Sequence, residues 1–186
     1  DYDVFEAIPT TTMKALYDQI TRYQGYTDIS KLSQVDSTKY NALVSAYNTA
    51  LTTYNAFDND YNAASYTKAQ VESATAALKN ALDGFTLTPD YSALNAKVAE
   101  ANPYLADTSL YTVSTAAALS KAVTAGTLTA KAFELKNYTT VQAFIDAYTA
   151  EQNKINASIQ PIEDAMQALA TQITFDTSTN GGENNV

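Results

Sequence analysis

Apolar side chains recur at steps of three and four residues along most of this sequence, and this spacing constrains the fold more than any other feature. In the first such stretch, Met13, Leu16 and Ile20 fall on one face of a helix. All-β folds need many glycine and proline turns, whereas this chain of 186 residues has only 5 glycines and 4 prolines. We therefore predict an all-α protein made of a few long helices.

The stretches with this spacing define the predicted helices. They run from about Thr12 to Tyr23, from Asp36 or Ser37 to the polar residues 58–62, from Thr67 to Gly84, from about Pro89 to Pro103, from Thr112 or Ser114 to about Gly126, and from Thr139 to about Leu169. The last helix is long, and we expect it to be kinked or split near Pro161, because proline removes a backbone hydrogen bond and clashes with the preceding turn. Strand is expected only in short pieces such as 172–175, where the alternation is brief.

Two of these helices begin with the same capping signal. Thr67 precedes Gln70 by three residues, and Thr139 precedes Gln142 in the same way. In a capping box the threonine oxygen accepts a hydrogen bond from the third helical N–H, and the glutamine oxygen accepts one from the threonine N–H. We predict that both pairs form such boxes.

Similarities between the two halves of the chain predict two tandem three-helix bundles that form an elongated segment. Residues 13–20 resemble residues 91–98 in the spacing of their apolar positions. This register places the modules at about 13–85 and 90–159.

A second register competes with the first. Residues 43–47 resemble residues 144–148, which places the second module at 115–175 and makes the helix at 91–102 a bridge. Both registers stay open. The predicted division is an extended lead-in (1–12), helical module 1 (13–85), a linker (86–89), helical module 2 (90–175) and a flexible tail (176–186).

The charge of the chain and its missing residue types exclude several kinds of function. The net charge is −9 and Arg22 is the single arginine, so the basic clusters that bind nucleic acid are absent. The chain has no histidine and no cysteine, which removes thiol nucleophiles, imidazole bases and Cys/His zinc sites. No apolar run approaches the roughly 20 residues of a membrane span. We expect a monomer with no cofactor, no nucleic-acid partner and no membrane insertion.

The pattern of apolar and capping residues resembles tandem FIVAR modules, small helical repeats "found in various architectures". The matching spacings are Leu43-x2-Ala46 and Val71-x2-Ala74-x3-Leu78 in the first half, and Tyr91-x2-Leu94-x3-Val98-x2-Ala101 and Leu119-x2-Ala122 in the second. The resemblance covers about 13–160. It implies three-helix modules in a large secreted or wall-anchored bacterial protein, acting as spacers and in some cases proposed to bind sugars or host proteins. The family offers no catalytic residues to carry over. A surface lipoprotein module of a Gram-negative bacterium has a similar composition and stays an alternative.

One loop resembles the start of a calcium-binding loop. Asp58, Asp60 and Asn62 have the spacing of the first ligands of an EF-hand. Such a loop then requires glycine at its sixth position and glutamate at its twelfth, where this chain has Ala63 and Ala69. We predict a solvated loop between helices and no metal site.

Tyrosine is the most unusual component, with 14 tyrosines and no tryptophan. Tyr40, Tyr47 and Tyr54 recur at seven-residue steps, which predicts a buried seam on one helix. Other tyrosines lie near helix ends or loops, where we expect them to staple the bundle ends with their hydroxyls reaching water: Tyr23, Tyr26, Tyr61, Tyr66, Tyr104, Tyr111 and Tyr138. Tyrosine binds sugars and proteins through its rigid amphipathic ring, so an exposed cluster is where a ligand would be sought.

The carboxylates do not predict an enzyme. Glycoside hydrolysis needs two acids flanking one bond, but Glu163 and Asp164 are adjacent on a helix, and Glu100 and Asp107 straddle a turn. We expect no catalytic residues, and the sequence identifies no ligand-binding residue. The leading hypothesis is a non-catalytic spacer or stalk module, outside the cell or on the cell wall or surface, that positions neighbouring domains. The alternative is a carbohydrate-binding or adhesive module that uses clustered surface tyrosines to bind an extracellular glycan or a host protein.

Overall fold

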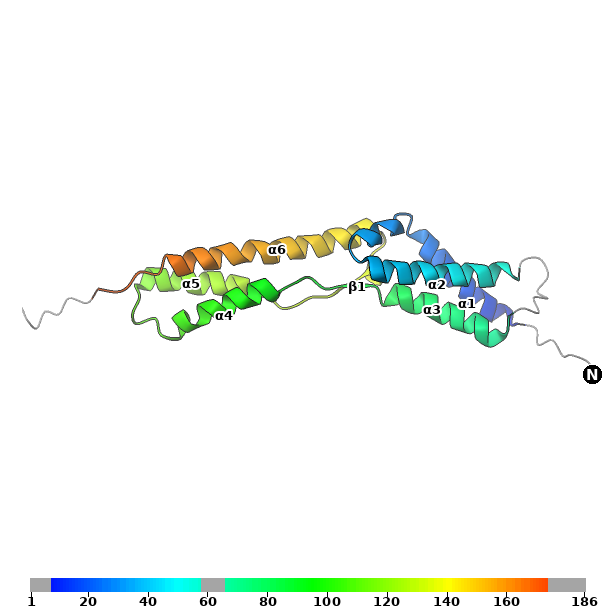
Figure 1. Cartoon of the computed structure of the whole chain (residues 1–186), viewed down its shortest axis with the longest axis horizontal. Helices are drawn as coiled ribbons and strands as arrows, with labels where there is room; N and C mark the ends of the chain where they lie inside the picture. The colour runs from blue at the N-terminus through cyan, green and yellow to red at the C-terminus, as the bar shows by residue number, and fades with distance from the viewer. Residues whose placement is uncertain (1–7, 58–65, 174–186) are drawn as a thin grey trace, which may run out of the picture. The chain divides into compact units, whose positions relative to one another are not determined.

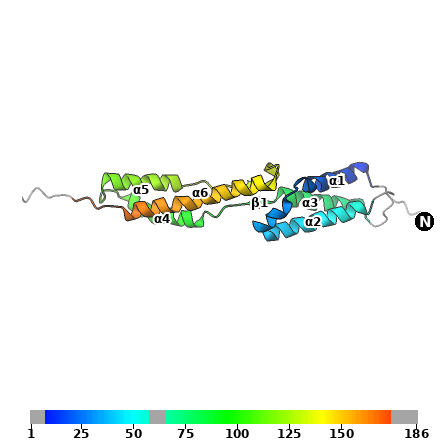
Figure 2. The same ribbon diagram turned by 90° about the horizontal axis from the view of Figure 1, so that it is seen from above.

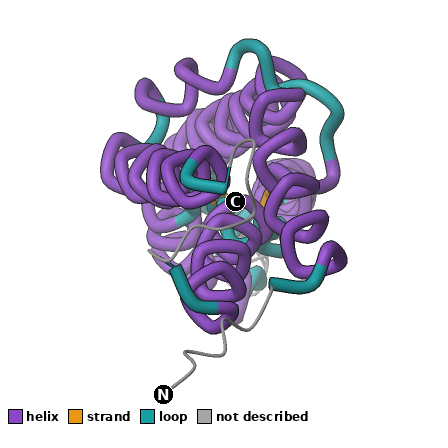
Figure 3. Tube along the Cα trace, turned by 90° about the vertical axis from the view of Figure 1, so that its right-hand side faces the viewer, coloured by secondary structure: helices purple, strands orange, loops and turns teal. Residues whose placement is uncertain are grey.

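Helices account for most of the computed structural model, which describes residues 8–57 and 66–173 (Figure 1). The α-helices are α1 (Thr10–Gly25), α2 (Ser37–Asn55), α3 (Lys68–Asp83), α4 (Ser92–Ala106), α5 (Val113–Gly126) and α6 (Val141–Gln167). The short elements are the 3-10 helices η1 (Ile29–Gln34) and η2 (Leu135–Asn137) and the strands β1 (Thr86–Leu87) and β2 (Phe133–Glu134). Figure 3 shows the same balance between purple helix and a trace of strand. The prediction of an all-α protein is confirmed.

The chain divides into two compact units, and the division does not follow the predicted modules. Unit 1 takes in the chain up to residue 89 together with residues 131–150, and unit 2 takes in residues 90–130 and the chain from residue 151 onward. The predicted assignment of 90–175 to one module is therefore wrong for residues 131–150.

A short β-ladder brings residues 131–150 back to unit 1. Strand β1 pairs with β2 in antiparallel register, so that 86–87 lie opposite 133–134. Beside this ladder the Leu135 N–H donates a hydrogen bond to the Phe85 carbonyl at 3.0 Å. The predicted linker at 86–89 is thus partly a strand of unit 1.

One hydrophobic core holds unit 1 together. Helices α1, α2 and α3 pack against one another, and the two views in Figures 1 and 2 agree on this arrangement. The largest fully buried side chains of this core are Leu16, Leu32, Leu43, Leu78, Leu82, Phe85, Leu135 and Phe144. Phe144, from α6, meets Phe85 edge-on with ring centroids 6.1 Å apart. Burial of Leu135 and Phe144 explains why the chain returns to this unit after α5.

The predicted capping box at the start of α3 is confirmed. The Gln70 N–H donates to Thr67 Oγ1 at 3.2 Å, and the Thr67 N–H donates to Gln70 Oε1 at 2.8 Å. The predicted cap of α2 is also present, because the Asp36 carboxylate accepts a hydrogen bond from the Lys39 N–H at 3.0 Å. Gly84 follows α3 as its C-cap, as the sequence predicts.

The predicted capping box at the start of α6 is wrong. The helix begins at Val141, two residues after Thr139, and the side-chain amide of Gln142 donates forward along the helix instead. Thr140 Oγ1 accepts a hydrogen bond from the N–H three residues later at 3.1 Å. The carboxylate of Asp28, far away in sequence, accepts from the N–H groups of Val141 and Gln142 at 3.3 and 3.1 Å. A residue of the α1–η1 connection therefore caps α6. A sequence signature confined to the start of α6 cannot predict this contact.

Unit 2 has a separate core. Helices α4 and α5 pack together, and the part of α6 from residue 151 onward completes the core. Its buried residues are Tyr91, Leu94, Ala101, Leu119, Val123, Ile155 and Ile162. Gly126 ends α5 against this core, where an added Cβ would lie 2.8 Å from Ile162 Cδ1 and 3.2 Å from Leu94 Cδ1. Both neighbours are terminal methyl groups, so a larger residue at this position would force the Ile162 and Leu94 side chains to shift within the core.

Two prolines lie inside helices. Pro103 does not end α4, which continues to Ala106, so this predicted boundary is wrong. Pro161 does not split α6, which continues to Gln167. Ile155 and Ile162 are fully buried on either side of Pro161, and their packing favours a continuous helix across the lost backbone hydrogen bond.

The predicted chain ends agree with the structure only in part. Helix α1 begins at Thr10, so the extended lead-in predicted for 1–12 is too long. The expected strand at 172–175 is reduced to an isolated bridge between Tyr111 and Thr171, and residues 174 and 175 lie outside the described residues, as does the predicted tail at 176–186. None of the helices that the structure describes is both long and apolar enough to cross a membrane.

Candidate functional site

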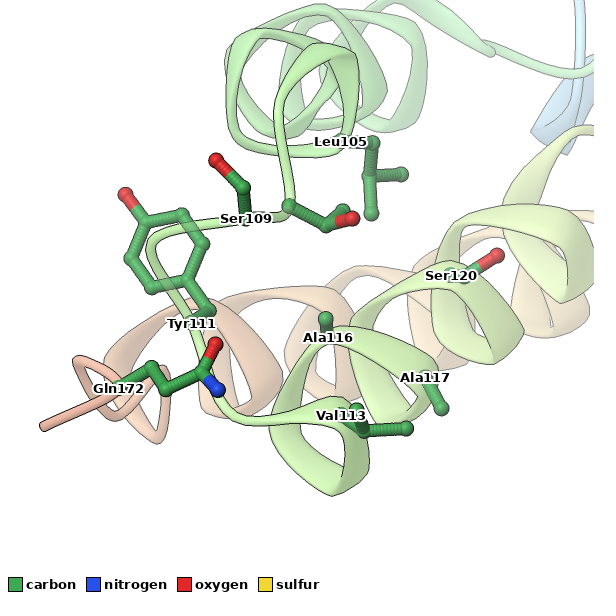
Figure 4. Close-up of a pocket in the computed structure, with 9 residues that line it drawn as sticks. Leu105, Ser109, Tyr111, Val113, Ala116, Ala117, Ser120 and Gln172 are labelled. Atoms are coloured by element: carbon green, nitrogen blue, oxygen red, sulfur yellow. The ribbon is translucent and has the colours of Figure 1, made fainter. Parts of the chain in front are cut away.

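The larger of the two open pockets described lies within unit 2, where the end of α4 faces the start of α5 (Figure 4). Its volume is about 490 Å³. The polar side chains that line it are Thr108, Ser109, Tyr111, Ser120 and Gln172, and the apolar ones are Leu105, Val113, Ala116 and Ala117. This volume falls within the roughly 300–1,000 Å³ of small-molecule sites, so we treat the pocket as the candidate site.

A tight polar turn shapes the side of the pocket that follows α4. The Asp107 carboxylate accepts hydrogen bonds from the Ser109 hydroxyl at 2.6 Å and from the Ser109 N–H at 3.0 Å. These two hydrogen bonds hold the pKa of Asp107 below its usual value, and the bond from the Ser109 hydroxyl has the larger effect. The Asp107 carboxylate is thus engaged within its own turn rather than directed at a ligand.

A backbone bridge places the segment after α6 against this turn. The Gln172 N–H donates to the Leu110 carbonyl at 2.7 Å, and the Thr112 N–H donates to the Ala170 carbonyl at 2.9 Å. These bonds flank the isolated bridge between Tyr111 and Thr171. As a result, the Gln172 side chain lies beside Tyr111 at the rim of the pocket (Figure 4).

Several polar groups in the pocket make no internal hydrogen bond. Within the described chain, the side chains of Thr108, Ser120 and Gln172 have no hydrogen-bond partner, and neither does the Tyr111 hydroxyl. Such groups are solvated in the absence of a ligand and can exchange water for ligand hydroxyls. The pocket therefore offers neutral donors and acceptors, and no group suited to acid–base chemistry at neutral pH.

Exposed apolar side chains concentrate at this end of unit 2. Five large hydrophobic residues of the described chain are classed as exposed, and four of them lie here: Tyr104 (42 % exposed), Leu110 (60 %), Val113 (85 %) and Ile173 (78 %). The rings of Tyr104 and Tyr111 meet edge-on, with centroids 6.3 Å apart. An apolar concentration of this kind marks a binding surface more often than isolated exposed residues do.

The heptad tyrosines of α2 form no exposed cluster. Tyr40, Tyr47 and Tyr54 are half-buried and pack against the core of unit 1, so the predicted seam is present but its rings are only partly covered. Tyr47 stacks on Tyr23 with ring centroids 3.8 Å apart. Burial is the largest cause that raises the pKa of Tyr23, and the neighbouring Tyr40 and Tyr47 raise it further.

The tyrosines predicted at helix ends differ in their burial and hydrogen bonding. The expectation that the Tyr26 hydroxyl reaches water is not met, because its single proton is shared between the backbone carbonyls of Leu135 and Tyr138 at 3.3 and 3.2 Å. Tyr66 is half-buried against Phe57. Tyr61 lies outside the described residues. Of the tyrosines named from the sequence, only Tyr104 and Tyr111 line or border the pocket.

None of the four carboxylates considered for catalysis, all in the described chain, is paired with another across a cleft. Asp107 belongs to the turn after α4, and Asp164 accepts a hydrogen bond from the Gln160 side-chain amide at 2.8 Å within α6. Lys97 Nζ donates to Glu163 at 2.6 Å and to Glu100 at 2.9 Å. The hydrogen bond from Lys97 is the largest cause that lowers the pKa of Glu163. The calcium-like residues at 58–62 lie outside the described chain, and the described part contains no group of three or more residues suited to hold a metal ion.

A buried polar pair in unit 2 escaped prediction. The Tyr91 hydroxyl donates to Glu151 Oε1 at 3.1 Å, and both residues are buried. In the sequence Tyr91 reads as an apolar position of its helix and Glu151 as a surface residue. The only available signal is that Glu151 stands four residues before the buried Ile155, on the same face of α6.

Comparison with family models, curated proteins and solved structures gives no match to this chain. The resemblance to FIVAR modules stays a prediction.

Proposed function

We propose that the chain is a non-catalytic helical spacer module of a larger secreted or cell-surface bacterial protein, which it serves by positioning neighbouring domains. The observation that carries the proposal is the presence of two separate hydrophobic cores, one in each unit. Helix α6 contributes Phe144 to the first core and Ile155 to the second. Units that bury their own cores can be arranged in series without a partner, as modular stalks require.

Small-angle X-ray scattering tests the spacer proposal. A compact globule of this length has a radius of gyration of about 16 Å, from the scaling of radius with chain length. A spacer predicts a radius well above that value and a pair-distance distribution with a long tail. Scattering that matches a compact globule would count against the proposal.

A second candidate function, a carbohydrate-binding or adhesive module, is favoured by the pocket in unit 2. The pocket has unengaged hydroxyl and amide groups in its lining, which also includes the exposed Val113. The exposed Tyr104, Leu110 and Ile173 belong to the same end of unit 2. Screening the protein on a glycan array and on immobilised extracellular-matrix proteins tests this function. Absence of binding to both at high protein concentration would exclude it and would leave the spacer proposal standing.

A further inference from the structure

The pocket in unit 2 carries no fixed charge in its lining. None of its lining residues is an aspartate, glutamate, lysine or arginine. The nearest carboxylate in sequence, that of Asp107, accepts both hydrogen bonds that Ser109 offers. A charged ligand would lose hydration on entry without gaining an oppositely charged partner. The net charge of −9 further disfavours anions.

Polar groups enter the pocket from three separate segments. Thr108 follows α4, Ser120 belongs to α5, and Gln172 follows α6. Their side chains make no hydrogen bond within the described chain, and Figure 4 shows Ser120 and Gln172 on different sides of the space. A hydroxyl both donates and accepts, and an amide offers two donors and an acceptor. The lining can therefore satisfy a ligand that carries several hydroxyl groups at different positions.

The same pocket offers apolar surface between these polar groups. Ala116 and Ala117 form a small-residue wall on α5, and Val113 extends it at the rim (Figure 4). The Tyr111 ring also lines the pocket, and the Tyr104 ring meets it edge-on. A sugar ring presents C–H groups on its faces and hydroxyls around its edge, so it needs both kinds of surface at once. A purely apolar ligand would leave the Thr108, Ser120 and Gln172 groups without partners when it displaced their water.

We propose that this pocket binds a neutral saccharide, one sugar residue of which lies between the alanine wall of α5 and Tyr111. The proposal rests on the second candidate function above and names its ligand class and its site. The site belongs entirely to unit 2, so it operates whether or not the chain also serves as a spacer.

The test uses two matched arginine substitutions on α5. Ala117 and its neighbour Ala118 are both exposed, but only Ala117 lines the pocket. Ala117→Arg places a long charged side chain at the site, and Ala118→Arg makes the same chemical change outside the lining. Saturation-transfer NMR and calorimetry are run on the full chain with neutral methyl hexosides, N-acetylhexosaminides and linear neutral oligosaccharides, and with a uronic acid as the charged comparison.

We expect millimolar or tighter binding of at least one neutral sugar, a loss of at least tenfold in affinity with Ala117→Arg, and a change below twofold with Ala118→Arg. Far-ultraviolet circular dichroism serves as the control that both variants are folded. The absence of binding by every neutral sugar, equal losses in both variants, or tighter binding of the uronic acid would each overturn the proposal. If a matrix protein binds and Ala117→Arg abolishes that binding while no sugar binds, the saccharide proposal fails and the adhesive function survives.

Discussion

The capping of α6 by Asp28 makes a sharp prediction, because it ties residues more than 100 positions apart within unit 1. The Asp28 carboxylate accepts from the Val141 and Gln142 N–H groups at 3.3 and 3.1 Å. Replacing Asp28 by alanine leaves two N–H groups of the first helical turn to water and removes a negative charge from the helix N-terminus. Loss of a side-chain cap costs about 1 kcal/mol, and loss of the charge at a helix end about 0.3–1 kcal/mol.

We therefore expect Asp28→Ala to lower the free energy of unfolding of unit 1 by about 1–2 kcal/mol, with the lower end favoured because both hydrogen bonds are long. Asp28→Asn keeps an acceptor oxygen and removes only the charge, so it should cost about half as much. Urea denaturation measures the global effect. Native-state hydrogen exchange measures the local one, where a tenfold faster exchange of the Val141 and Gln142 amides corresponds to about 1.4 kcal/mol.

The matched control is Asp18→Ala. Asp18 is an exposed acid on α1 whose partner is Lys14, four residues earlier. Its removal should change stability by less than about 0.5 kcal/mol and leave exchange at Val141 unchanged. If Asp28→Ala behaves like Asp18→Ala in both assays, Asp28 does not hold the start of α6. The hydrogen bonds from Val141 and Gln142 to Asp28 would then not stabilise the packing of α6 in unit 1.

The other predictions concern one cap, one close contact and one ion pair. Thr67→Ala should lower the free energy of unfolding by about 1 kcal/mol and Thr139→Ala by less than about 0.5 kcal/mol, because only Thr67 forms a capping box; equal losses in urea denaturation would contradict this. Gly126→Val should destabilise unit 2 by about 1–3 kcal/mol through overpacking, and a rise in thermal midpoint would show that the core has room there. The pKa of Glu163 is lowered in the folded state, chiefly by the hydrogen bond from Lys97. The ionised Glu163 side chain therefore contributes fully to the stability of the fold above the ordinary glutamate pKa of about 4.3, and this contribution is lost as the pH falls below it. The wild type should therefore lose thermal stability more steeply than Glu163→Gln as the pH falls from about 5 to 3, and parallel profiles would argue against the pairing.

Signals that act over a few residues were enough to predict the helices. The apolar spacing from Met13 to Ile20 defines the buried face of α1, and the Thr67–Gln70 box marks the start of α3. Both signals are patterns among residues at most seven positions apart. Such a pattern can be recognised without knowing which other element covers the helix, so the sequence alone contains it.

The return of residues 131–150 to unit 1 depends on contacts that no local pattern contains. Leu135 and Phe144 have the same apolar character whichever core they enter. The contacts that select unit 1 are non-local, and they include the pairing of β2 with β1 and the capping of α6 by Asp28. The failed capping box at Thr139 has the same origin. Its Thr-x-x-Gln signature is the same as that of the box at Thr67. At α6, however, the N-terminal N–H groups are capped by Asp28, which lies far away in the sequence.

The candidate pocket was only partly visible in the sequence. Tyr104 and Tyr111 were identifiable as loop tyrosines with a possible ligand role. Ser120 and Gln172 were not, because a polar residue on the exposed side of a helix, or just after one, usually faces water alone. Their approach depends on the bridge between residues 110–112 and 170–172, which has no periodic signature.

Pulsed electron paramagnetic resonance tests the spacer proposal most directly. The chain has no cysteine, so label pairs can be introduced cleanly at the exposed residues Asn48 on α2 and Lys121 on α5, one in each unit. A control pair at Asn48 and the exposed Ala76 of α3 lies within unit 1 and gives the distribution width of packed helices. A spacer that positions its neighbours predicts a single distance between the units with a width close to that of the control. A broad or multiple distribution for Asn48 and Lys121, beside a narrow control, would contradict it.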